Sequence, residues 1–140
     1  QQVRSIDIGK SKVQVAVAHR GALDTRRGRV AEHDLVTEVY VVMSGGGTIL
    51  TGADLVNKVR RPPDNRAVQF LNGPGNNADD VRDGVTHQLK QGDVFVIPAG
   101  TGHEFTEIPD HITYMMVRVD PDKVVPLMDA TASRRYLDQQ

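Results

Sequence analysis

The feature that most constrains how this chain can fold is the segment 92–105, which reads GDVFVIPAGTGHEF. A Gly-Asp turn dipeptide opens it, and the four apolar residues 94–97 predict a short strand covered on both faces. Pro98 removes a backbone donor and ends regular pairing, and the two glycines after it permit a tight reversal. His103 and Phe105 follow two residues apart, so they are expected on one face of the next strand. The segment therefore predicts a histidine held just past a strand–turn–strand corner.

The spacing within this segment, Gly-x5-Pro-x-Gly-x2-His, resembles the second motif of the cupin superfamily. The first cupin motif, His-x-His-x3-4-Glu-x6-Gly, is similar to residues 31–45, where His33 and Glu38 stand at the right interval before a glycine. Three positions depart from the family pattern. Thr25 stands where a glycine is expected six residues before the start of the first motif. Ala31 stands where the first histidine is expected, and Glu107 replaces the asparagine that continues the second motif.

The resemblance covers nearly the whole chain, and the sequence looks like those of small bacterial single-domain cupins. It implies an all-β fold, a jelly-roll or double-stranded β-helix barrel, formed by one domain over residues 1–140. The length suffices to bury a core without disulfides or other covalent links, and the hydrophobic content of 39% is ordinary for a globular domain. The tail after Pro126, which ends MDATASRRYLDQQ, predicts a short C-terminal helix of one or two turns, capped near Asp129 or Thr131.

In the resembled family the two motifs face each other inside the barrel and present His, Glu and His to one divalent metal ion. Carried over by position, the ligands here are His33, Glu38 and His103. The residue types support this independently, because neutral imidazole with carboxylate suits Fe, Mn, Ni, Cu or Zn. Two histidines and one carboxylate also leave coordination positions open. The sequence therefore predicts one divalent transition metal and indicates no other cofactor.

Two further histidines are candidates for a fourth ligand, with ordinary burial or exposure as the alternative for each. His19 ends the apolar side of an expected strand, together with Val13, Val15 and Val17, before a polar loop that begins at Arg20. His87 lies two residues before a leucine on another expected strand, so it shares that residue's face.

The residues next to Glu38 predict the wall of the cavity. Glu38, Tyr40 and Val42 share one face of a strand at period two, and Phe105 shares a face with His103. Tyr40 is expected to line the cavity, with proton donation from its phenol as the alternative. After this strand, residues 44–47 are expected to form a turn.

Three loops are expected to connect these elements. The 46 residues between the motifs hold two loops rich in Pro, Gly, Asn and Asp, around 57–66 and 73–84, and long loops of this kind often select substrates. A third loop carries Arg26, Arg27 and Arg29. That basic cluster is either a solvated surface or a site for an anionic ligand.

Composition excludes several functional classes. A net charge of −1 argues against nucleic acid as a partner, and no apolar run approaches the roughly 18 residues of a membrane span. Zero cysteines exclude disulfides and thiolate metal sites. The chain begins Gln1-Gln2 without Met, so we expect a periplasmic or secreted protein, with the cytoplasm as the alternative. A homodimer is expected from the general prevalence of symmetric pairs and from the resemblance.

Three functions remain open at this point. The first is a metal-dependent oxidoreductase of the dioxygenase or oxidase kind, with isomerase, lyase or hydrolase chemistry on the same scaffold as variants, acting on a small organic or sugar-like molecule. The second is a non-catalytic small-molecule or carbohydrate-binding cupin that has lost part of the metal site along with the histidine at position 31. The third is a storage or structural protein. The fold cannot choose among them, because function depends on the site.

Overall fold

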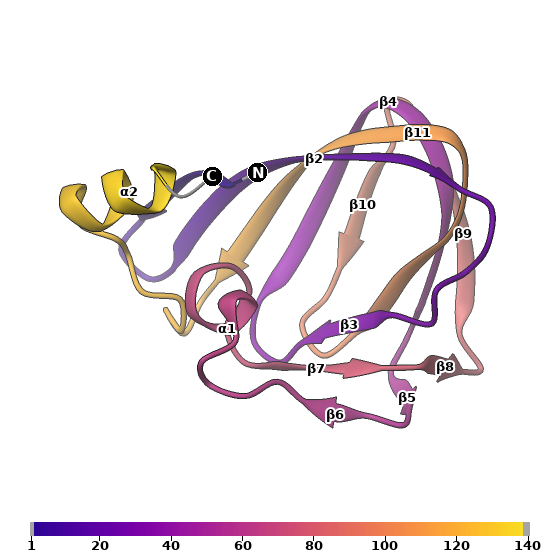
Figure 1. Cartoon of the computed structure of the whole chain (residues 1–140), viewed down its shortest axis with the longest axis horizontal. Coiled ribbons are helices and arrows are strands. Elements are labelled where there is room, and N and C mark those ends of the chain that lie inside the picture. The colour runs from indigo at the N-terminus through magenta and orange to yellow at the C-terminus, as the bar shows by residue number, and fades with distance from the viewer. Residues whose placement is uncertain (1, 139–140) are drawn as a thin grey trace.

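The computed structural model of this protein describes residues 2–138, and most of them lie in antiparallel strands (Figure 1). The all-β prediction is thereby confirmed. The elements in chain order are β1 (Gln2–Asp7), β2 (Lys12–Leu23), β3 (Val30–His33), β4 (Thr37–Gly52), β5 (Asp54–Val56), β6 (Val59–Arg60), α1 (Arg66–Phe70), β7 (Gly75–Ala78), β8 (Asp80–Arg82), β9 (Val85–Lys90), β10 (Val94–Ile97), β11 (Gly102–Asp120) and α2 (Ala130–Leu137).

Two long strands, β4 and β11, close the barrel because each belongs to two sheets. One sheet has the order β1-β2-β11-β4-β10. The other has the order β6-β7-β3-β11-β4-β9. The strands β5 and β8 form a separate pair. The strand that carries Glu38 and the strand that carries His103 therefore run side by side along the barrel wall (Figure 1).

The turn expected over residues 44–47 is wrong, because β4 continues through them without a break. The glycines there bend the strand instead of reversing it. Gly45 has a φ of +69°, and a Cβ at this position would collide with the backbone carbonyl of His111 on β11. The pairing of the two strands also shifts in register between Glu107 and Ile112. The bend lets β4 pass from one sheet to the other.

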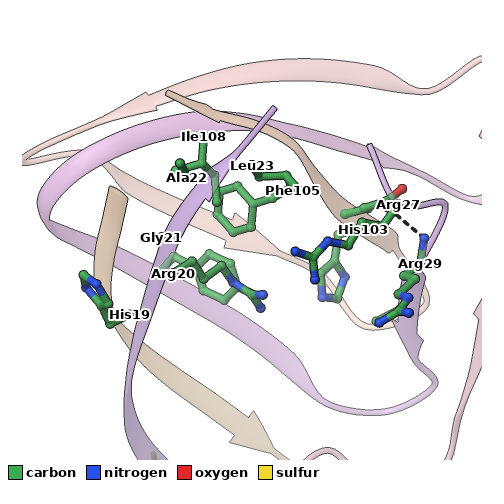
Figure 2. A pocket seen from close by; sticks show the side chains of 13 residues that line it. His19, Arg20, Gly21, Ala22, Leu23, Arg27, Arg29, His103, Phe105 and Ile108 are labelled. Atoms are coloured by element: carbon green, nitrogen blue, oxygen red, sulfur yellow. Dashed lines mark hydrogen bonds between the residues drawn. The ribbon is translucent and has the colours of Figure 1, made fainter. Parts of the chain in front are cut away.

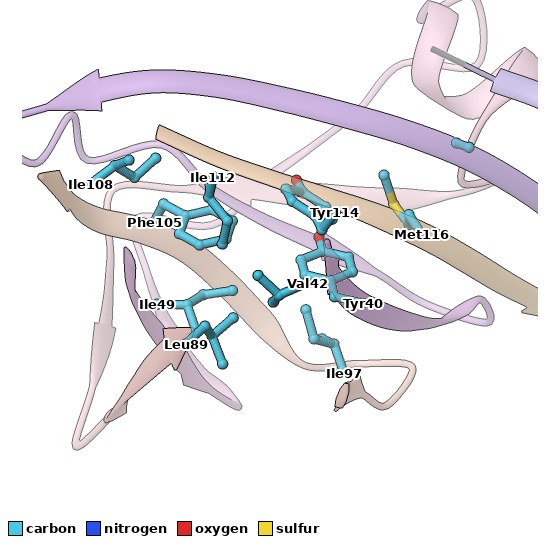
Figure 3. Close-up of a cluster of buried hydrophobic side chains, with 11 residues drawn as sticks. Tyr40, Val42, Ile49, Leu89, Ile97, Phe105, Ile108, Ile112, Tyr114 and Met116 are labelled. Carbon is cyan, nitrogen blue, oxygen red and sulfur yellow. The ribbon is translucent and has the colours of Figure 1, made fainter. Parts of the chain in front are cut away.

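The inward face of β4 confirms the period-two prediction. Glu38, Tyr40 and Val42 are buried, whereas Met43 is 52% exposed. Tyr40 and Val42 contribute to an apolar core that fills one end of the barrel (Figure 3). The aromatic rings of that core pack together, with the centroids of Tyr40 and Tyr114 4.3 Å apart and those of Phe105 and Tyr114 5.8 Å apart.

Two predictions about strand faces are wrong. In β2 the buried side carries Gln14 and Ala16, while Val17 and His19 point outward, and the strand continues past Arg20 to Leu23. In β10 only the alternate residues face the core, and Val94 and Val96 are 64% and 53% exposed.

These outward residues share one surface. The strand register aligns them in two apolar rows across β2, β11, β4 and β10, here called the outer apolar face: Val17, Met115, Val41 and Val94 in one row, and Val15, Val117, Val39 and Val96 in the other.

The segment between the motifs contains more regular structure than predicted. It forms β5 to β8 and the one-turn helix α1, whose N-cap Asn65 accepts a hydrogen bond from the backbone N–H of Ala67. The predicted C-terminal helix is confirmed as α2, capped by Asp129, and it lies outside the barrel at one end (Figure 1). Within residues 2–138, neither helix has the length and apolar character needed to cross a membrane.

Candidate metal centre

The barrel brings His33, Glu38 and His103 together from β3, β4 and β11. His33 Nε2 lies 3.7 Å from Glu38 Oε1, and His103 Nε2 lies 3.6 Å from Glu38 Oε2. The candidate ligand atoms of all three residues lie within 4.8 Å of one another, and all three side chains are buried. Ala31 pairs with His103 across the two neighbouring strands, so its methyl lies beside this group.

The carboxylate of Glu38 accepts three hydrogen bonds. The Asn72 amide and the Arg118 guanidinium each donate to Oε1 at 2.8 Å, and the Tyr40 hydroxyl donates to Oε2 at 2.8 Å. Burial on its own would raise the pKa of Glu38, but His33, Arg118 and His103 outweigh it and lower that pKa to about 2. Burial and the Glu38 charge raise the pKa of the Tyr40 phenol. Glu38 is therefore ionised at neutral pH, and Tyr40 keeps its proton.

The tautomer of His103 is set by the backbone. Its Nδ1 lies 3.1 Å from the carbonyl oxygen of Thr101, and a carbonyl can only accept, so Nδ1 carries the proton. Nε2 is then the nitrogen with the free lone pair, on the side of Glu38. Burial lowers the pKa of His103, so the ring stays neutral at pH 7.

His33 lies between two donors. The Asn72 amide nitrogen is 2.8 Å from Nε2, and Arg61 Nη1 is 3.3 Å from Nδ1. A neutral imidazole accepts through one nitrogen only, so one of these two contacts is a hydrogen bond at any time. Burial lowers the pKa of His33 to about 3, which keeps the ring neutral. The shorter contact favours acceptance at Nε2, the nitrogen nearer Glu38.

These residues fit a divalent transition metal in composition and in protonation state. Metal binding requires neutral imidazoles and an ionised carboxylate, and burial and charge provide both here. Oε2 of Glu38 has one donor and keeps a lone pair available, whereas Oε1 is occupied by Asn72 and Arg118. The Asn72 amide also occupies the lone pair of His33 Nε2, so it would have to give way to a metal ion there. The buried His–Glu–His cluster could therefore bind a metal ion, with a guanidinium bonded to its carboxylate.

Sequence reasoning missed three residues of this centre: Arg61, Asn72 and Arg118. Arg118 carried a signal, because it lies in period two with Tyr114 and Met116 on the buried side of β11. Asn72 and Arg61 come from the segment between the motifs, where substrate selection was expected. No pattern in that segment singled out either residue.

The two candidates for a fourth ligand lie elsewhere. His19 is exposed, and its Nδ1 is 2.8 Å from the Thr113 hydroxyl. His87 is half-buried, with Nε2 3.1 Å from the Thr51 hydroxyl and its ring 4.9 Å from that of Phe95. Neither belongs to the group of ligand atoms within 4.8 Å of one another.

Two adjoining cavities reach the cluster. One, of about 380 Å³, contains His33, Glu38 and Arg118 in its wall, and the other, of about 450 Å³, opens beside Phe105 (Figure 2). The residues common to both walls are Arg20, Ala31, Tyr40 and His103. Tyr40 and Phe105 line the cavity of about 450 Å³, whereas Val42 is part of the apolar core.

Comparisons with known proteins give one family match over part of the chain and several solved structures of low sequence identity. Residues 81–140 match the family described as the AraC-like ligand binding domain. A crystal structure from Bacillus halodurans is similar at 14% identity, covering 91% of this chain and 72% of that chain with a TM-score of 0.47.

A cupin 2 conserved barrel domain protein from Salinispora arenicola is similar at 14% identity, covering 100% of this chain and 82% of that chain with a TM-score of 0.40. An oxalate decarboxylase from Lactobacillus farciminis is similar at 12% identity over 85% of this chain but 31% of its own, with a TM-score of 0.40. No curated protein matches the chain.

Proposed function

We propose that the protein is a cupin and a metal-dependent enzyme that acts on a small organic molecule inside the barrel. The observation that supports this best is the buried group of His33, Glu38 and His103, whose candidate ligand atoms lie within 4.8 Å of one another. Adjoining cavities give a small molecule access to it.

We favour an oxidoreductase of the dioxygenase or oxidase type as the reaction class. A bound metal ion would supply redox or Lewis-acid chemistry, and two imidazoles with one carboxylate leave positions on it for a substrate and a co-substrate. The chain's own residues prepare the site for this role. Thr101 orients the His103 ring, and Tyr40 and Arg118 hold the two oxygens of Glu38 in place.

Metal content tests this proposal. Protein purified without a metal-affinity tag, then reconstituted with Fe, Mn, Ni, Cu or Zn, should retain one metal ion per chain that chelators remove. The variant His103→Ala should lose the metal and stay folded, because the barrel core supplies most of the stability. His87→Ala is the matched control, because His87 lies outside the cluster, and it should retain the metal.

Two results would count against a metal enzyme. The first is the absence of measurable metal after reconstitution with all five ions. The second is loss of the fold in His103→Ala, because that would assign His103 a structural role in the core.

A second candidate is a non-catalytic cupin that binds a small molecule or a carbohydrate. The Arg118–Glu38 contact favours it, because a guanidinium at 2.8 Å already neutralises the carboxylate without a metal. The match of residues 81–140 to the AraC-like ligand binding domain also supports it. In that case, ligand affinity would be the same before and after treatment with a chelator.

A further inference from the structure

We propose that the larger of the two adjoining cavities, of about 450 Å³, binds a small organic carboxylate. In this proposal Arg20, Arg27 and Arg29 recognise its carboxylate group. The inference deepens the proposed function, because it names the class of molecule that the site acts on. The binding step itself depends on the arginines and does not require a metal ion.

The arginines converge on one cavity of about 450 Å³ (Figure 2). Arg20 projects from β2 into the cavity, where its Nε donates to the Tyr114 hydroxyl at 3.1 Å and its guanidinium carbon lies 5.5 Å from the centre of the Phe105 ring. Arg27 and Arg29 come from the segment before β3 and lie on the side of His103 (Figure 2). These guanidiniums enter the cavity from two different parts of the chain.

The charges in this cavity do not balance. Its one carboxylate belongs to Glu104, which accepts hydrogen bonds from Arg26 Nε at 2.8 Å and from the backbone N–H of Arg29 at 2.7 Å. Arg26 also forms an ion pair with Asp80 at 2.7 Å. Glu104 is therefore engaged in fixing the loop that carries the arginines.

The three guanidiniums that line the cavity have no such partner. Among residues 2–138, no ion pair joins the side chain of Arg20, Arg27 or Arg29 to a carboxylate. Guanidinium groups suit carboxylates, which they bind through paired hydrogen bonds. The excess positive charge therefore selects an anion.

Part of the remaining wall is apolar. Phe105, Leu23 and Ile108 line the cavity together with the arginines (Figure 2), so the site suits a ligand with an apolar or aromatic body beside its charged group. The cavity volume suits a small molecule. Ala31 lines both cavities with only a methyl group, so the larger cavity adjoins the one that contains His33 and Glu38.

Benzoate and its neutral analogue benzamide are suitable probes. Each is titrated into chelator-treated full-length protein, and binding is followed by calorimetry and by NMR shifts. Benzoate should bind at least about tenfold more tightly than benzamide, a ratio that corresponds to about 1.4 kcal/mol. Arg20→Gln and Arg27→Gln should each weaken benzoate about tenfold without affecting benzamide. Arg82→Gln is the control, because Arg82 is exposed and pairs with Asp54 away from the cavity, and it should leave the affinity unchanged.

Two outcomes would overturn the inference. One is equal affinity for benzoate and benzamide, and the other is unchanged benzoate affinity in both arginine variants. If Arg20→Gln fails to fold, Arg27→Gln on the loop decides alone. The metal proposal is tested separately by repeating the titration with metal-loaded protein. Benzoate binding that needs the metal and ignores the arginines would refute the inference and leave the metal enzyme standing. Arginine-dependent binding in protein that retains no metal even after reconstitution would support the inference and count against the metal enzyme.

Discussion

Replacement of Arg118 by methionine should destabilise the metal-free protein strongly. Arg118 Nε donates to Glu38 Oε1 at 2.8 Å, and the two side chains are 7% and 2% exposed. The substitution keeps an unbranched chain of similar length but removes the guanidinium. Glu38 would then remain as a buried carboxylate with the neutral donors Asn72 and Tyr40.

The expected size follows from that burial. Removing one partner of a buried ion pair costs about 3–5 kcal/mol, because the other charge stays in a medium that solvates it poorly. For a domain of this size, this corresponds to a fall in Tm of roughly 10–20 °C. Glu38→Gln combined with Arg118→Met should cost less than Arg118→Met alone, because no unpaired charge is left.

Denaturant unfolding of chelator-treated protein measures this loss, and Arg82→Met is the matched control. Arg82 makes the same kind of pair with Asp54 at 2.9 Å, but both side chains are more than half exposed, so its removal should cost at most about 1 kcal/mol. Adding a metal that binds the cluster should restore part of the stability lost in Arg118→Met, since the ion supplies the missing positive charge. A loss in Arg118→Met no larger than in the control would refute the reasoning.

Three further predictions concern the site and the surface. Ala31→His should tighten metal binding and lower activity, because the imidazole would take an open position, and an unchanged affinity in chelator competition would contradict this. The free energy of unfolding should fall as the pH drops from about 6.5 toward 3, by about 1.4 kcal/mol per pH unit for His33. In this range the histidine is protonated in the unfolded chain, whereas in the folded protein it stays neutral because its pKa is lowered to about 3. Glu38, whose pKa is lowered to about 2, adds a further loss below about pH 4.5. A flat denaturant stability from pH 6.5 to 5 would disprove the assignment of His33. The protein should form a homodimer through the outer apolar face, so that Val96→Asp or Met115→Asp yields a single 15.4 kDa chain by ultracentrifugation, and a monomeric wild type would exclude it.

The resemblance to the two cupin motifs was sufficient to predict the barrel and its three central residues, and the two-residue period predicted the faces of some strands. The strand before Pro98 and the chain reversal after it depend on local backbone chemistry. The buried face of residues 38–42 follows from the two-residue period of a strand. Motif spacing then identified His33, Glu38 and His103, and the structure brings their candidate ligand atoms within 4.8 Å of one another. Local chemistry and short spacings are properties that a sequence displays directly.

Tertiary structure alone decided which face of β2 lies inside. Both faces carry apolar residues, so the two-residue period shows that the faces differ without showing which one the barrel covers. In the folded protein Ala16 faces inward and Val17 faces outward. His19 lies on the same face as Val17, so it points away from His33, Glu38 and His103. The glycines at 45–47 suit a turn and a bend equally well, and pairing with β11 selected the bend.

The environment of Glu38 was also a tertiary outcome. Its partners Asn72 and Arg118 lie 34 and 80 residues away along the chain, and barrel closure brings them to one carboxylate. The hydrogen bonds from Asn72 and Arg118 help to keep Glu38 ionised, and the Arg118 guanidinium places a positive charge beside the candidate metal position. These quantities depend on distance in space and on exclusion of water, and neither is determined before the strands have paired.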